Sequence, residues 1–129
     1  MAAGEGLSAR ERADIERAAQ RAGDLAGLTF SVLFADAEGD VRAYSERAHA
    51  SLSHPASSVL VFVDPAARRL EIVTGSDALR RIDNRAAKLA ALAMTSGFSN
   101  GDLAGGVVDG LQMLGEYGNH PPVMHTDTP

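Results

Sequence analysis

Four aspartates lie where predicted strands end or predicted helices begin. Asp36 follows the first predicted strand, and Asp64 lies between the second strand and the turn after it. Carboxylates from such positions can converge on one edge of a sheet, and several converging oxygens bind a hard divalent cation. A bound cation can activate water for hydrolysis. The sequence therefore predicts a candidate Ca²⁺ or Mg²⁺ site formed by Asp36, Asp64, Asp83 and Asp102.

The same aspartates also have structural interpretations. Asp64 precedes Pro65 and can accept hydrogen bonds from the backbone of its own turn. Asp83 can cap the helix that follows it, and Asp102 lies in the first turn of the last predicted helix, where the helix dipole stabilises a carboxylate. Metal binding and local capping are both compatible with these positions.

Other residues with chemical potential form no recognised catalytic arrangement, and we assign no catalytic residue. The chain has no cysteine, which excludes disulfides, zinc–thiolate sites, iron–sulfur clusters and a cysteine nucleophile. His49 and His54 lack the spacing of helical metal ligands and are predicted to lie on the surface or in a loop. Arg80, Arg81 and Arg85 lie close to acidic residues, which predicts an ion-pair network or, alternatively, an anion-binding face.

Composition limits the class of protein. The 129 residues are 45% hydrophobic and 22% charged, as expected for a single globular domain. The net charge of −5 argues against a nucleic-acid partner, because binding to phosphates requires a basic excess. The longest unbroken apolar run, residues 59–63, is far shorter than the roughly 20 residues of a membrane span. The N-terminus has no signal-peptide pattern, so a cytoplasmic location is expected.

The elements that must position these residues follow from periodicity and capping signals. The predicted helices are 9–22, 41–52, 85–96 and 101–116, with Gly23 and Gly97 as helix ends, and the predicted strands are 28–35, 58–63 and 69–74. A helix separates the first two strands, so they should be parallel. The apolar residues of the second strand are continuous, so it should be buried on both faces, and Asp64-Pro65 should open an antiparallel hairpin.

The predicted fold class is therefore α/β, a three-layer α/β/α sandwich with a small mixed sheet. A single domain should span residues 8–117, between a flexible N-terminus (1–7) and a flexible C-terminal tail (118–129). Gly105, Gly106 and Gly110 lie inside the last predicted helix, where each costs about 1 kcal/mol relative to alanine. Such a cost predicts that the helix packs closely against a neighbouring element.

Residues 58–114 contain the runs SSVLVFVDPAARRLEIVTG and SNGDLAGGVVDGLQML. These runs resemble the TPM domain family, in an actinobacterial branch of unknown function. Its motif positions include Asp64, Asp83 and Asp102, together with a structural set consisting of Gly75, Phe98, Gly101, Gly106 and Gly110.

This resemblance implies an α/β sandwich with a small sheet flanked by helices. Some members of that family are acid phosphatases or bind divalent ions through loop aspartates, and others are accessory proteins in membrane complexes. Residues 75–79 depart from the family's usual Gly-Tyr-Gly-Leu-Glu run and lack its second glycine, its glutamate and its aromatic residue. The departure favours a non-catalytic protein-interaction module with an unidentified protein partner; the alternative is a divalent-metal-dependent hydrolase similar to acid phosphatases.

Overall fold

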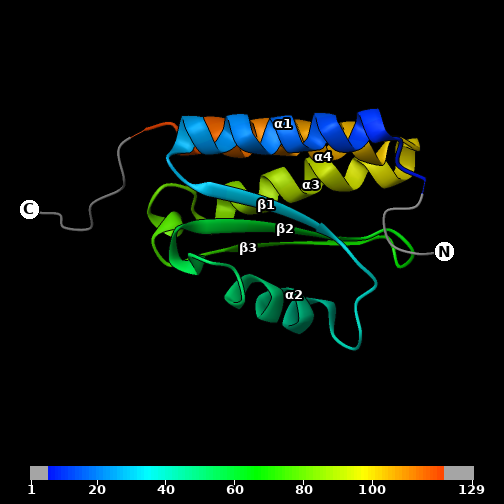
Figure 1. The fold of residues 1–129 in the computed structure, drawn as a ribbon, viewed down its shortest axis with the longest axis horizontal. Coiled ribbons are helices and arrows are strands. Elements are labelled where there is room, and N and C mark those ends of the chain that lie inside the picture. The colour runs from blue at the N-terminus through cyan, green and yellow to red at the C-terminus, as the bar shows by residue number, and fades with distance from the viewer. Residues whose placement is uncertain (1–5, 121–129) are drawn as a thin grey trace, which may run out of the picture.

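The structure is a computed structural model that describes residues 6–120. Its helices are α1 (Ala9–Ala26), α2 (Val41–Ala50), α3 (Asn84–Asn100) and α4 (Leu103–Gly118), and its strands are β1 (Thr29–Phe34), β2 (Ser58–Asp64) and β3 (Arg69–Thr74). Two short 3-10 helices, η1 (Pro55–Ser57) and η2 (Ala78–Arg80), lie in the connections. Figure 1 shows α1, α3 and α4 on one face of the sheet and α2 on the other.

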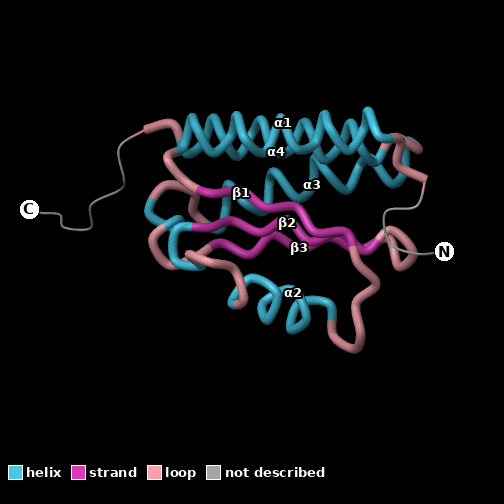
Figure 2. The backbone as a smooth tube through the Cα atoms, in the orientation of Figure 1, coloured by secondary structure: helices cyan, strands magenta, loops and turns pink. Residues whose placement is uncertain are grey.

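The three strands form one mixed sheet in the order β1–β2–β3 (Figure 2). β1 pairs with β2 in parallel, from Thr29 opposite Ser58 to Phe34 opposite Val63, and β3 pairs with β2 antiparallel. All seven residues of β2 are buried, as the continuous apolar run 59–63 within it predicts. The predicted α/β fold with a small mixed sheet is confirmed.

Two hydrophobic clusters lie on opposite faces of the sheet. The larger one joins alternate residues of the strands, such as Val61 and Phe30, to the inner faces of α1, α3 and α4. The smaller one joins the other face of β2, including Phe62, to Val41 and Tyr44 of α2. Side chains alternate between the two faces of a strand, so β2 contributes to both clusters.

The helices begin next to their capping residues, but α1, α3 and α4 end later than predicted and α2 ends two residues earlier. Ser8 and Glu11 form the predicted capping box of α1. The predicted ends at Gly23 and Gly97 are wrong, because α1 continues to Ala26 and α3 to Asn100.

The residues that end these two helices are glycines with a left-handed backbone. Gly27 and Gly101 both have φ of 70°, and each donates its N–H to the carbonyl of the glycine four residues earlier. Gly23 itself is required for close approach, since a Cβ there would lie 2.7 Å from the Leu28 carbonyl oxygen. A glycine within a helix therefore does not end it unless the backbone turns left-handed.

The glycines of α4 lie where this helix approaches its neighbours. A Cβ on Gly106 would lie 2.8 Å from the Met94 carbonyl oxygen of α3, and a Cβ on Gly115 would lie 2.9 Å from the Ala22 Cα of α1. A Cβ on Gly110 would collide with the Met94 side chain, whereas one on Gly105 would meet only the Asp102 side chain. Small residues thus let α4 lie against both α1 and α3.

Residues near both ends of the described chain are part of the folded domain. Leu7 packs against the larger cluster and Gly118 ends α4, although both belong to the segments that the sequence predicts to be flexible. Residues 1–5 and 121–129 of those segments lie outside the described residues. Within residues 6–120, no helix combines the length and the apolar character needed to cross a membrane.

Substitution of the α4 glycines should separate backbone from side-chain crowding. Gly106→Ala should lower the free energy of unfolding by about 1–3 kcal/mol, because the new methyl group meets the rigid backbone of α3. Gly105→Ala should cost less, since the new methyl group meets only the side chain of the exposed residue Asp102. Urea unfolding of both variants measures the difference, and an equal loss in both would contradict this account.

Candidate functional site

Asp64 has a structural role at the end of β2. Its side chain is buried, with 4% of the residue exposed. One carboxylate oxygen accepts the N–H of Ala37 at 3.0 Å, and the other accepts the N–H of Ala67 at 3.1 Å. Asp64 thereby ties the loop after β1 to the turn between β2 and β3.

The other predicted metal ligands are not brought to Asp64 as a group. Asp83 caps α3 by accepting the N–H of Ala86 at 2.8 Å, and Asp102 caps α4 by accepting the N–H of Gly105 at 3.0 Å. Asp36 lies exposed in the loop after β1.

The length of α3 explains why these carboxylates do not converge. Asp83 precedes this 17-residue helix and Asp102 follows it, so about 25 Å of helix separates them. Within residues 6–120, no group of three or more histidine, aspartate or glutamate side chains is placed to hold a metal ion. The structure therefore does not assemble the predicted Ca²⁺ or Mg²⁺ site.

Two further sequence features have structural explanations. His49, predicted to lie on the surface or in a loop, is buried where α2 packs on the sheet, and its Nε2 lies 3.0 Å from the Ser58 carbonyl oxygen. Residues 97–101, GFSNG, match the G-x-S-x-G pattern of a nucleophile elbow, but an elbow joins a strand to a helix. Here Ser99 lies in the last turn of α3, so these residues do not form a nucleophile elbow.

The basic group after β3 fastens the end of α4. Arg81 donates from Nη1 to the carbonyl oxygens of Gly118 and His120, at 3.3 and 2.6 Å. These acceptors are backbone carbonyls, whereas the sequence predicts carboxylates in an ion-pair network. Arg81 therefore stabilises the C-terminal end of the helix layer.

The distinctive surface of this domain is the outer edge of β1. The N–H of Ala35 donates to the Val63 carbonyl oxygen at 3.0 Å, so the backbone N–H and C=O groups of Ala35 face β2. In a strand, the backbone N–H and C=O groups of successive residues point to opposite edges. Phe30, Val32 and Phe34 therefore direct their N–H and C=O groups away from β2. The strand sequence, TFSVLF, contains no charged residue and no proline. It therefore lacks the usual protection of an edge strand against pairing.

The opposite edge of the sheet is protected by a charged side chain. Arg42 of α2 donates to the Ile72 carbonyl oxygen at 3.0 Å and to Glu71 at 3.1 Å. Partial burial acts to lower the pKa of Arg42, but hydrogen bonds to Glu71 and Glu46 raise it above its usual value. The permanently charged guanidinium thus occupies the outer side of β3.

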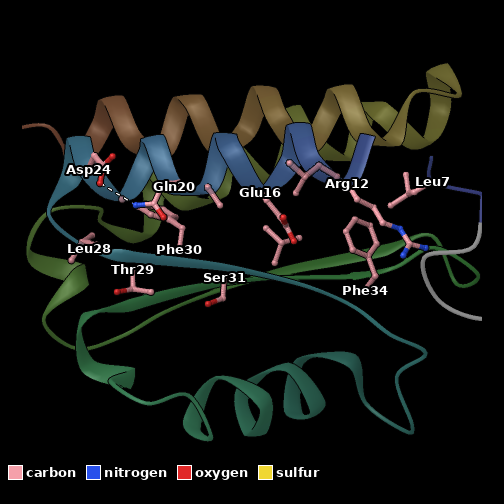
Figure 3. Close-up of a pocket in the computed structure, with 14 residues that line it drawn as sticks. Leu7, Arg12, Glu16, Gln20, Asp24, Leu28, Thr29, Phe30, Ser31 and Phe34 are labelled. Carbon is pink, nitrogen blue, oxygen red and sulfur yellow. Dashed lines mark hydrogen bonds between the residues drawn. The ribbon is translucent and has the colours of Figure 1, made fainter. Parts of the chain in front are cut away.

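A groove of about 700 Å³ runs between α1 and β1, and we call it the β1 groove. Figure 3 shows Phe30 and Phe34 pointing from β1 toward α1, while Thr29 and Ser31 point away from it. The opposite wall is a row of exposed polar residues on α1, spaced four apart: Arg12, Glu16, Gln20 and Asp24.

The other face of β1 is also incompletely covered. α2 packs against β2 and β3, so Leu33 stays 36% exposed. Among the described residues, no other strand pairs with the outer edge of β1, and parts of both of its faces are exposed. An accessible apolar strand beside a groove can bind an extended chain, but it offers no nucleophile or acid–base pair. The sequence predicts the strand, but only the pairing order reveals that it lies at an edge.

Removal of the Asp64 carboxylate should destabilise the domain. Asp64→Ala removes the acceptor of two part-buried hydrogen bonds, so the free energy of unfolding should fall by about 1–3 kcal/mol. Asp64→Asn keeps one carbonyl acceptor and should lose less. Chemical unfolding of the two variants measures this order, and an unchanged stability of Asp64→Ala would contradict the structural role.

Proline substitutions should distinguish the paired from the open side of β1. Ser31→Pro removes an N–H that faces β2 and should cost about 2–3 kcal/mol of unfolding free energy. Val32→Pro removes an N–H that faces the open edge and should cost less than half that amount. Thermal and urea unfolding test this, and the reverse order would show that the edge has been assigned wrongly.

Comparisons with known proteins place the chain in a family and a fold. Residues 3–115 match the family model described as "Domain of unknown function (DUF5130)". The fold is similar to the NMR structure of the BA42 protein from the psychrophilic bacterium Bizionia argentinensis, with a TM-score of 0.73 and 19% identity over 88% of this chain and 82% of that one.

A second solved structure has the same fold. The N-terminal domain of the cg2496 protein from Corynebacterium glutamicum matches with a TM-score of 0.73 and 16% identity, over 88% of this chain and 75% of that one. A search of curated proteins finds no match.

The resemblance to the TPM domain family is wrong, because the family model that matches the chain is a different one. The motif positions that suggested it serve general structural needs: Asp83 and Asp102 cap helices, Gly101 ends one, and Gly75 lies too close to the Pro55 carbonyl for a Cβ. Such needs recur in many α/β folds. The chain belongs to the DUF5130 family, a family of domains of unknown function.

Proposed function

We propose that this domain is a non-catalytic protein-interaction module that adds an extended segment of a protein partner to β1. The observation that carries the proposal is the open, uncharged edge of β1 beside the β1 groove. In strand addition, main-chain hydrogen bonds supply affinity and side-chain pockets supply specificity. Phe30, Val32 and Phe34 present the main-chain groups, and the groove receives side chains.

The energy of such binding is compatible with a reversible interaction. Each main-chain hydrogen bond contributes about 0.5–1.5 kcal/mol net. Leu33 is 36% exposed, so an added strand would also bury apolar surface of β1. These gains are offset by the entropy of ordering the incoming segment. Affinities in the micromolar range are the expected result.

The alternative, a metal-dependent hydrolase similar to acid phosphatases, has less support. Such an enzyme needs several oxygen ligands around a cation. In the described part of the chain, no three acidic or histidine side chains are so placed, and Asp64 already accepts two backbone N–H groups. We therefore favour binding over hydrolysis.

Selection from a library of random heptapeptides displayed on phage should test the module. Selected peptides should change the NMR shifts of the Phe30, Val32 and Phe34 amides. Val32→Pro removes a donor from the binding edge, so it should weaken binding about fivefold or more.

Thr74→Pro is the matched control, since it places the same residue on the outer side of β3. It should leave the affinity unchanged. Selected peptides that bind Val32→Pro as tightly as the unmodified domain, or that shift amides elsewhere, would show that β1 is not the binding edge.

A further inference from the structure

The polar row of α1 has a spacing that matches an added strand. Arg12, Glu16, Gln20 and Asp24 recur every four residues and line the β1 groove. Four residues of α-helix rise about 6 Å, and two residues of a strand rise about 6.6–6.8 Å. Every second side chain of a strand added to β1 would therefore lie opposite one member of this row.

The charges along the row are ordered. Figure 3 shows Asp24 near Leu28 and Thr29, at the beginning of β1, and Arg12 near Phe34 at its end, with Glu16 between them. Gln20 donates to Asp24 at 3.2 Å. Within residues 6–120, Glu16 forms no ion pair. The wall of the groove is thus acidic along most of β1 and basic only at the far end.

A second copy of this chain does not suit the groove. Two β1 strands paired edge to edge would lie about 4.8 Å apart, with one α1 helix above each strand. Packed helices need axes about 8–10 Å apart. An extended segment without a flanking helix has no such conflict, so the groove favours a single strand from a different protein.

We propose that the segment bound at β1 carries basic side chains at positions i and i+4 on its α1-facing side, opposite Asp24 and Glu16. This inference rests on the proposed function, since it names the chemistry of the segment that β1 binds. The apolar residues between these positions would face Leu33 and the open side of the sheet.

Synthetic peptides test the charge pattern directly. The probe is the acetylated and amidated heptapeptide Lys-Val-Thr-Val-Lys-Val-Thr, used together with its reversed sequence because the strand can add in either direction. The control peptides exchange both lysines for glutamate. Dissociation constants come from NMR shifts of the Phe30, Val32 and Phe34 amides at low salt, where exposed charges are least screened.

Variants of the protein supply the matched controls. The double variant Glu16→Lys, Asp24→Lys reverses the acidic part of the row. The double variant Asp109→Lys, Glu116→Lys makes the same change of net charge on exposed positions of α4, away from the β1 groove. Neither pair belongs to the hydrophobic clusters, so both variants should fold.

The expected result is that the lysine probe binds about tenfold more tightly than the charge-exchanged peptide. This preference should reverse in Glu16→Lys, Asp24→Lys and persist in Asp109→Lys, Glu116→Lys. Equal binding of both peptides, with shifts at the β1 amides, would overturn the charge pattern and leave the interaction module standing.

Other outcomes would overturn more. If neither peptide nor any phage-selected peptide shifts the β1 amides at millimolar concentration, both the charge pattern and the proposed function fail. If the amides of Phe30, Val32 and Phe34 are protected from hydrogen exchange in the free protein, a second copy or the chain's own segment already covers the edge, and the inference is wrong. Sedimentation equilibrium separates these two occupants.

Discussion

All seven residues of β2 are buried. Side chains must therefore cover both of its faces, and the backbone N–H and C=O groups on both of its edges must form hydrogen bonds. A buried backbone group without a hydrogen bond costs free energy comparable to a lost hydrogen bond. β1 and β3 supply the hydrogen-bond partners along the two edges of β2. Helices on opposite faces of the sheet cover Val61 and Phe62. In a sheet of three strands, complete protection of the centre leaves both remaining strands with one open side.

The two outer strands differ in how that open side is treated. Arg42 reaches from α2 to the outer carbonyl of Ile72, and β3 itself carries Arg69 and Glu71. The sequence of β1 itself contains no charged residue, and α2 does not extend over this strand. The position of α2 over β2 and β3 thus has two consequences: it supplies the arginine that blocks one edge, and it leaves Leu33 exposed near the other. This asymmetry is the basis of the proposed interaction surface.

The motif residues illustrate how structural requirements can imitate a functional signature. Aspartates at helix starts and glycines at helix ends recur because capping and left-handed backbone conformations favour those residue types. Asp83 and Asp102 bond to the backbone three residues ahead, at opposite ends of α3. Their positions in the sequence are compatible with a metal site, and the length of the helix between them separates their carboxylates. Similarity of such positions is weak evidence for a particular family or chemistry.

Local signals in the sequence determined the order of the elements, the buried central strand, the parallel pairing of β1 with β2, and the capping box at Ser8 and Glu11. These features depend on periodicity and on contacts between residues close in the chain. Tertiary structure alone decided that Gly23 lies within a helix, that the aspartates stay apart, and that β1 lies at an open edge facing the polar row of α1. Each of these depends on which distant segments pack together, and on how far α2 extends across the sheet, which no local pattern specifies.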